Sequence, residues 1–148
     1  MSSVSEIMSK REIVTITAFS GKSSQEVASL MINKKVGSVI VIDKNTEPLG
    51  IITERDIVKH IYLKNIAASR IKVEEIMSAP LITIMSYDSI DTASRVMTKN
   101  KIKRLAVLEE DNRIVGLLSV TDIIRHLAKI LVDDYNRYRS LRFAIDLS

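Results

Sequence analysis

The chain has 148 residues, of which 46% are hydrophobic and 27% charged, and its net charge is +4. This composition predicts a folded domain with a substantial core and excludes an intrinsically disordered chain. The lack of cysteine excludes disulfides, cysteine-ligated zinc and thiol nucleophiles. With neither an apolar leader nor a membrane-length apolar run, we expect a cytoplasmic protein without a membrane segment.

The predicted elements follow one order twice along the chain. In the first half, a β-branched run at 13–16 predicts a strand, and apolar residues at helical spacing predict a helix over 24–34. Two more strands are expected at 38–42 and 49–52, with a polar turn between them, before a second helix that starts near Thr53. The second half predicts strands at 81–84, 105–108 and 114–118, and helices over 89–100 and from near Ser119.

The sequence itself repeats in step with this order. GIITERDIVKHI at 50–61 returns as GLLSVTDIIRHL at 116–127. Upstream, Val4 to Met8 echoes Val73 to Met77 at a slightly longer offset, so either Thr15 or Thr17 is the counterpart of Thr83. One unit of about 60 residues would leave a sheet face exposed. We therefore expect an α/β (α+β) fold in which two β-α-β-β-α repeats pack through their sheets about a pseudo-twofold axis.

Both repeats place Thr/Ser-x-x-Asp where the last strand meets a helix, as Thr53 with Asp56 and Ser119 with Asp122. One interpretation is a capping box, in which hydroxyl and carboxylate satisfy main-chain N–H groups at the helix start. The other is a nucleotide site, because a helix N-terminus favours phosphate. An aspartate one turn further on can accept hydrogen bonds from both hydroxyls of a ribose.

The repeat that ends in Gly-(Ile/Leu)-(Ile/Leu)-(Thr/Ser)-x-x-Asp resembles the cystathionine-β-synthase (CBS) domain. Two in tandem resemble a CBS-domain pair, or Bateman module, from about Val4 to about Leu127. The resemblance implies repeats at 1–66 and 67–127, followed by a C-terminal helix and basic tail at 128–148. It also implies two clefts between the repeats that bind AMP, ADP, ATP or S-adenosylmethionine, and dimerisation of modules into a flat disc.

The same resemblance implies ligand-binding residues. Asp56 and Asp122 match the ribose-binding aspartate, and Thr53 and Ser119 match the hydroxyl position beside it. The two clefts should be unequal, because Arg55 stands where the second repeat has Thr121 and because the first repeat lacks the cations of the second. Those cations are either phosphate partners or the solvated end of a helix. The remaining expected contacts are Arg55 and its counterpart Thr121; Gly37 and Ser38 before the middle strand of repeat one; Lys101, Lys103 and Arg104 at that place in repeat two; and Thr83 with Thr15 or Thr17 in the first strands.

We therefore expect a stand-alone regulatory module, a homodimer, that senses an adenosine ligand and signals to an effector protein of unknown identity. No catalytic set stands out, and one histidine with one aspartate per repeat is too small a metal site, so we expect no enzyme, required cofactor or metal. One alternative is a structural adaptor without ligand. The other is a nucleic-acid binder that uses the basic patch and a C-terminal basic-aromatic tail. An amphipathic helix is expected over 123–138, and the tail overlaps its end. The tail holds Tyr135, Arg137, Tyr138, Arg139, Arg142 and Phe143.

Overall fold

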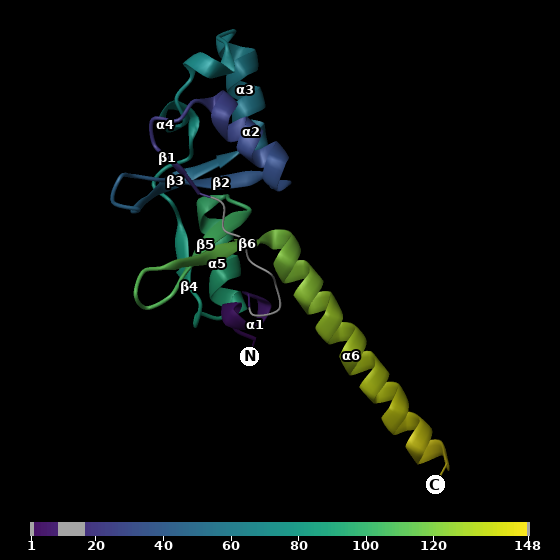
Figure 1. The fold of residues 1–148 in the computed structure, drawn as a ribbon. Coiled ribbons are helices and arrows are strands. Elements are labelled where there is room, and N and C mark those ends of the chain that lie inside the picture. Colours follow the sequence, from purple (N-terminus) through teal and green to yellow (C-terminus); the bar gives the residue numbers. More distant parts are fainter. Residues whose placement is uncertain (1, 9–16, 148) are drawn as a thin grey trace. The chain divides into compact units, whose positions relative to one another are not determined.

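The fold is mixed α/β, with two three-stranded sheets and helices around them (Figure 1). A computed structural model describes residues 2–8 and 17–147. The first sheet has the order β1 (Thr17–Phe19), β2 (Ser38–Ile42), β3 (Pro48–Thr53), and the second has the order β4 (Thr83–Met85), β5 (Arg104–Leu108), β6 (Ile114–Ser119). The helices are α1 (Val4–Met8), α2 (Ser24–Lys34), α3 (Glu54–Lys64), the 3-10 turn η1 (Ala68–Arg70), α4 (Val73–Ile76), α5 (Ile90–Asn100) and α6 (Val120–Leu147).

The order predicted from the sequence is confirmed. The middle and last strands of each repeat and the helix starts lie close to their predicted positions. The predicted strand at 13–16 lies outside the described residues, and β1 covers Thr17–Phe19. In the second repeat, β4 starts at Thr83 rather than at the predicted residue 81.

The structure also identifies the counterpart of Thr83. The Ser20 N–H donates to the Ile42 carbonyl at 2.9 Å, and the Ser86 N–H donates to the Leu108 carbonyl at 2.9 Å. Both ends of this hydrogen bond are displaced along the chain by the same step that takes the phrase at 50–61 to 116–127. Thr17 therefore corresponds to Thr83. The spacing between matching residues of the two repeats is longer for Val4 to Met8, so the extra residues of the first repeat fall within the sequence 9–16.

Each repeat contributes its short leading helix to the compact unit built from the other repeat. One unit contains α1 with residues 84–113 and 117–147, and the other contains residues 17–83 with 114–116. The Val4 N–H donates to the Asp88 carbonyl at 2.9 Å, and the Val73 N–H donates to the Lys22 carbonyl at 3.0 Å. These two bonds are counterparts under the repeat, so the exchange is reciprocal.

The short helices form because of this packing. An isolated helix of four or five residues is not stable in water. Val4 and Ile7 of α1, and Val73 and Ile76 of α4, are instead buried. Within its unit, α1 contacts α6, and α4 contacts α3 in the other.

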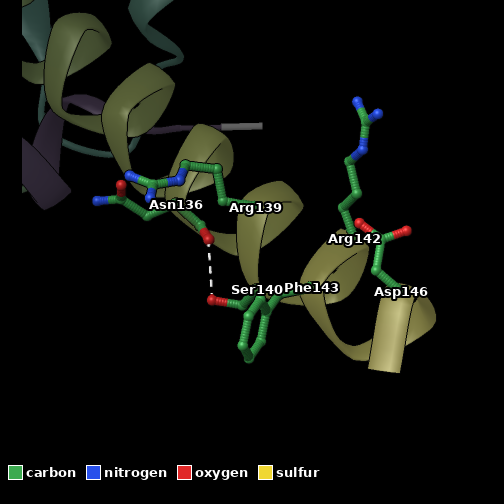
Figure 2. A pocket seen from close by; sticks show the side chains of 6 residues that line it. All are labelled: Asn136, Arg139, Ser140, Arg142, Phe143 and Asp146. Carbon is green, nitrogen blue, oxygen red and sulfur yellow. Dashed lines mark hydrogen bonds between the residues drawn. The ribbon is translucent and has the colours of Figure 1, made fainter. Parts of the chain in front are cut away.

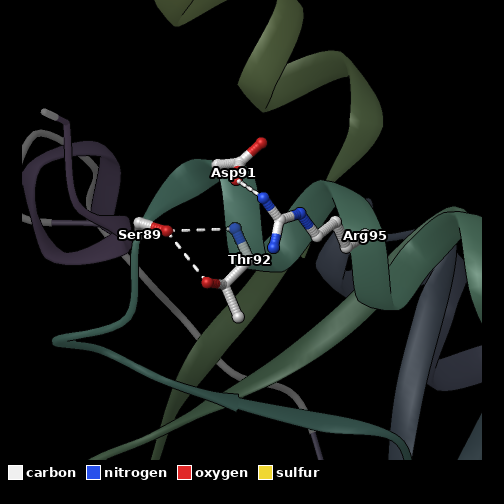
Figure 3. Close-up of polar contacts among 4 residues, drawn as sticks. All are labelled: Ser89, Asp91, Thr92 and Arg95. Carbon is white, nitrogen blue, oxygen red and sulfur yellow. Dashed lines mark hydrogen bonds and ion pairs between the residues drawn. The ribbon is translucent and has the colours of Figure 1, made fainter.

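The longer helices begin at side-chain caps, two of which, at Thr53 and Ser119, the sequence predicts. At α5, the Ser89 Oγ accepts from the Thr92 N–H at 3.0 Å and lies 2.9 Å from the Thr92 hydroxyl (Figure 3). Asp91 and Arg95, one turn apart, form an exposed ion pair at 2.7 Å. Exposed pairs of this kind contribute little stability, so the cap is the stronger determinant of where α5 begins.

The last helix is longer than the sequence analysis expected. We predicted a helix over 123–138 followed by a basic tail, but α6 is helical from Val120 to Leu147. No glycine or proline interrupts this stretch, and good helix formers such as leucine, arginine and alanine recur along it. No helix in residues 2–8 and 17–147 is both long and apolar enough to cross a membrane.

Gly50 is placed where a second backbone segment approaches β3. Ile51 and Ser78 exchange two main-chain hydrogen bonds, of 3.0 and 2.8 Å, which hold the segment after α4 against β3. A Cβ on Gly50 would overlap the Ser78 carbonyl oxygen and press on the Met77 sulfur. Glycine is required here because the segment after α4 leaves no room for a Cβ.

Replacing Gly50 by alanine should therefore destabilise the protein by about 1–3 kcal/mol, the usual range for an overpacked site. Gly37→Ala is the matched control, since a Cβ there meets only the Glu54 carboxyl group at ordinary distances of 3.6–3.7 Å. Its effect should stay within about 0.5 kcal/mol. Urea unfolding followed by circular dichroism measures both. Equal midpoints for the two variants would contradict the role given to Gly50.

Candidate functional site

The candidate site of the first repeat is the junction of β3 and α3. Thr53 has extended backbone angles and caps α3, and its Oγ1 accepts from the Asp56 N–H at 3.3 Å. The Asp56 carboxylate accepts from the Thr53 N–H at 2.9 Å and from the Thr53 hydroxyl at 3.0 Å. Both side chains are half-buried. The capping box that the sequence predicts is thus present, with its carboxylate held at the helix N-terminus.

The junction of β6 and α6 repeats this geometry in the second half. The Ser119 Oγ accepts from the Asp122 N–H at 3.1 Å, and the Asp122 carboxylate accepts from the Ser119 N–H at 2.8 Å. Asp122 is only 7% exposed, whereas Asp56 is half-buried. The two junctions therefore share the same main-chain hydrogen bonds and differ in accessibility.

A main-chain hydrogen bond joins each junction to the segment that precedes the middle strand. The Glu54 N–H donates to the Gly37 carbonyl at 3.1 Å, and the Val120 N–H donates to the Lys103 carbonyl at 3.0 Å. In the first sheet, Ser38 lies opposite Thr53 in the antiparallel register of β2 and β3. The predicted site residues Gly37, Ser38, Thr53 and Asp56 are thus brought together, as are Lys103, Ser119 and Asp122.

The other predicted site residues lie on the elements that form these junctions or on the first strands. Arg55 and Thr121 are exposed in the first turns of α3 and α6. Lys101 is the left-handed residue that ends α5, and Arg104 is the exposed first residue of β5. Thr17 and Thr83 begin β1 and β4, each next to the central strand of its sheet. Thr15 lies outside the described residues.

Comparison with known families identifies this arrangement. The CBS-domain sequence profile matches residues 4–63 and again residues 73–129. The chain belongs to the CBS-domain family. Two matches in tandem make it a CBS pair, and CBS pairs are regulatory modules.

Individual relatives of this CBS pair agree with the family match. An uncharacterised protein of Methanopyrus kandleri is 29% identical over 83% of this chain, and one of Methanocaldococcus jannaschii is 32% identical over 74%. The chain spans only 61% and 59% of the length of these two relatives. Among solved structures, a CBS-domain pair in complex with 5′-methylthioadenosine and S-adenosyl-L-methionine is 27% identical, covers 87% of this chain and 98% of its own, and has a TM-score of 0.74.

One residue at the first junction was not among the sequence-predicted contacts. Glu54 follows Thr53 and begins α3, and its carboxyl group lies beside the Gly37 backbone, 3.6 Å from where a Cβ would stand. The second repeat has Val120 at this position, while Lys103 and Arg104 replace Gly37 and Ser38. The change from Glu54 to Val120, one of two changes of residue character in the repeated phrase, was the available signal.

This difference changes the balance of charge between the two junctions of the CBS pair. A carboxylate is added beside the helix start in the first repeat, and two cations precede and begin the middle strand in the second. Charges within a few ångströms of a ligand change its binding more than distant ones do, since salt screens interactions beyond about 10 Å. The second junction therefore has more positive charge near its helix start than the first.

The apolar residues in the central strands that directly follow predicted site residues are core residues. Val39 and Leu105, each in the central strand of its sheet, are fully buried. Val39 packs in the hydrophobic cluster of its unit with Val27 and Met31. The corresponding positions on the last strands, 51 and 117, are half-buried and keep part of their surface accessible.

A surface hollow lies elsewhere, on the second half of α6 (Figure 2). Its lining comes from this one helix, and all of its side chains are exposed. One hydrogen bond links two lining residues, from the Ser140 Oγ to the Asn136 carbonyl at 3.0 Å. The hollow lacks the buried polar groups that a built ligand site has. The lining residues are Asn136, Arg139, Ser140, Arg142, Phe143 and Asp146.

In the described part of the chain, no group of three or more histidine, aspartate or glutamate side chains is placed to hold a metal ion. Asp56 and Asp122 instead accept hydrogen bonds from the main-chain N–H groups at their own helix starts.

Proposed function

We propose that this CBS pair is a regulatory module that binds adenosine-containing ligands at its two strand-to-helix junctions and signals to an effector protein. The observation that carries the proposal is the duplicated box, with a carboxylate fixed 2.8–2.9 Å from a main-chain N–H at a helix start. Thr53 with Asp56, and Ser119 with Asp122, are the central ligand contacts. The module acts in the cytoplasm as a homodimer, and its effector is not identified by sequence or structure.

One aspartate carboxylate can cap the helix and bind a ribose at the same time. An ionised aspartate offers about four acceptor positions on its two oxygens. The two hydrogen bonds that Asp56 accepts from Thr53 use one oxygen, Oδ2. A ribose that approaches the helix start can donate its two hydroxyls to the same carboxylate, in charge-assisted bonds that are stronger than neutral ones. The cap holds the aspartate in one orientation before the ligand arrives, which reduces the entropy cost of binding.

The helix start and the family both support the proposed ligand class. A CBS pair that is 27% identical to this chain was crystallised with 5′-methylthioadenosine and S-adenosyl-L-methionine. Both ligands carry an adenosine whose ribose suits the paired aspartates. AMP, ADP and ATP share that ribose and add phosphate, which a helix N-terminus favours.

We further propose that the two junctions prefer different ligands. Lys103 and Arg104 provide positive charge beside the second helix start, so phosphate-bearing nucleotides should bind there. Glu54 disfavours phosphate at the first junction and favours a neutral or sulfonium-bearing nucleoside. The remaining proposed contacts, on the same elements and the first strands, are Arg55, Thr121, Gly37, Ser38, Lys101, Thr17 and Thr83.

The ligand can act on the effector only through unequal affinity for two states of the module. The helix that begins next to Ser119 is α6, which also contacts α1 from the other repeat. A ligand at that helix start therefore acts on an element that both repeats share. Its differential affinity for the two states sets the largest shift it can produce.

The nucleic-acid alternative is less well supported by the structure. Its basic and aromatic residues lie on α6 together with Asp133, Asp134 and Asp146. Arg137 also pairs with Asp134 at 3.9 Å, where the carboxylate offsets its charge. A surface of mixed sign attracts a phosphate backbone weakly. In the adaptor alternative the boxes are only caps, so ligand titration of an aspartate variant distinguishes it from our proposal.

Asp122→Ala should weaken one of two adenosine-binding events by about 10- to 100-fold, the loss expected for a charge-assisted hydrogen bond of about 1.5–3 kcal/mol. Isothermal titration with AMP and with 5′-methylthioadenosine measures this loss, and Asp56→Ala should weaken the other event. Ser89→Ala is the control, because it removes an N-cap from the same unit at a comparable stability cost of about 1 kcal/mol. The adaptor alternative is favoured instead if Asp122→Ala and Ser89→Ala bind ligand equally well, or if the unmodified protein binds no adenosine ligand at tens of micromolar.

Lys103→Ala/Arg104→Ala should weaken AMP and ATP binding on the order of tenfold and leave 5′-methylthioadenosine binding within about twofold, because only the nucleotides carry phosphate. The dependence of ATP affinity on salt should also fall. Arg95→Ala/Lys99→Ala removes the same charge from the exposed face of α5 and should change neither ligand. Equal loss of both ligands in the first variant would show that these cations do not contact phosphate.

A further inference from the structure

Between Leu127 and Ile145, α6 has an exposed apolar stripe with the spacing of a coiled coil. Leu131, Tyr138 and Ile145 recur at intervals of seven, and Leu127 and Leu141 lie four positions before Leu131 and Ile145. This alternation of three and four is the heptad pattern whose two apolar positions face a partner helix. We call these five residues, with Asp134 in the remaining heptad position, the α6 stripe.

The five apolar side chains of the stripe are 45–70% exposed. The corresponding helix of the first repeat, α3, ends at Lys64 after 11 residues, whereas α6 has 28. Most of the stripe therefore lies in an extension without a counterpart in the other repeat. A helix of that length spans about 42 Å. An apolar row of this length, interrupted only at Asp134, marks an interaction surface, because soluble proteins seldom leave one uncovered.

The order of charges along α6 indicates what covers the stripe. Near the middle of the stripe, Asp133 and Asp134 precede Arg137, Arg139 and Arg142, while Arg125, Lys129 and Asp146 lie toward the ends of the helix. In a parallel pair of identical helices, Asp134 would face its own copy in the seam, which places two like charges together. In an antiparallel pair, the acidic segment of one helix faces the basic segment of the other.

An antiparallel pair centred near Asn136 also aligns the apolar residues. Leu131 and Leu141 are equally far from Asn136, as are Leu127 and Ile145. Asp134 then faces Tyr138, whose hydroxyl is a donor for the carboxylate. Every stripe residue thus has a complementary partner in a second copy of the same helix. An isologous contact of this kind closes at two copies.

We propose that α6 pairs antiparallel with α6 of a second copy of this chain through the stripe, with Leu131 against Leu141, Leu127 against Ile145 and Asp134 against Tyr138. This pairing does not depend on the ligand proposal. It adds to the proposed homodimer a defined contact outside the repeats. Most of the residues around the hollow of Figure 2, including Asn136, Arg139 and Phe143, lie on the opposite face of the helix by their spacing, so they stay accessible.

Engineered disulfides in the full-length chain test the pairing, since the chain has no cysteine of its own. Leu131→Cys and Leu141→Cys are purified separately, mixed under reducing conditions and then oxidised, and the products are read on a non-reducing gel. The mixture should give a covalent dimer, and neither variant alone should do so. In the antiparallel pair, residue 131 is displaced by about 15 Å along the helix axis from its own copy, whereas a disulfide needs Cα atoms within about 7 Å.

Two further mixtures sharpen the result. Leu127→Cys with Ile145→Cys should also cross-link, which fixes the register independently. Val132→Cys with Leu141→Cys is the matched control, because Val132 is 57% exposed and next to Leu131 but lies off the stripe. That mixture should stay monomeric on the gel. Circular dichroism checks that every variant keeps its helix content.

Two outcomes would overturn the inference. Cross-linking of Leu131→Cys alone and of Leu141→Cys alone would show a parallel pair. The inference also fails if the stripe mixtures give no more covalent dimer than the Val132 control. Any contact between copies would then lie elsewhere, whether the protein sediments as a dimer or as a monomer. Such a result would leave the adenosine sites untouched, because their test is ligand titration.

Discussion

One hydrogen bond in each repeat holds the candidate site together. It runs from the first N–H of the junction helix to the carbonyl before the middle strand, from Glu54 to Gly37 and from Val120 to Lys103. It joins segments that are separated in sequence by two strands and their turn, and it fixes the residues before β2 and β5 beside a helix N-terminus. The capping box then orients the aspartate in the same place. Everything proposed about ligand binding depends on this geometry.

The sequence predicted the parts of the molecule that depend on local pattern. The repeat, the order of strands and helices, and both Thr/Ser-x-x-Asp caps follow from periodicity and from the chemistry of helix starts. What it missed depends on contacts between distant segments. Gly50 needs to be glycine because Ser78 lies against it, and the reciprocal placement of α1 and α4 appears only in three dimensions. The carboxylate of Glu54 became a site residue only when the fold placed it beside Gly37.

The two halves of the chain keep the same main-chain hydrogen bonds and differ in charge. Duplication conserves backbone geometry easily, because a cap needs only a hydroxyl and a carboxylate at the right spacing. The side chains around the cap are freer to change, and here Gly37 and Ser38 correspond to Lys103 and Arg104. The result is a module with two similar junctions of different electrostatic preference. At the second junction, the helix that would bear the ligand continues into the stripe that we assign to a second copy.

A crystal structure of the chain grown with AMP and 5′-methylthioadenosine together tests the central claim most directly. We expect the ribose hydroxyls of each bound ligand within hydrogen-bond distance of Asp56 or Asp122, with the phosphate of AMP beside Lys103 and Arg104. Ligand bound away from both aspartates, or both carboxylates occupied only by their caps at saturating ligand, would contradict the account.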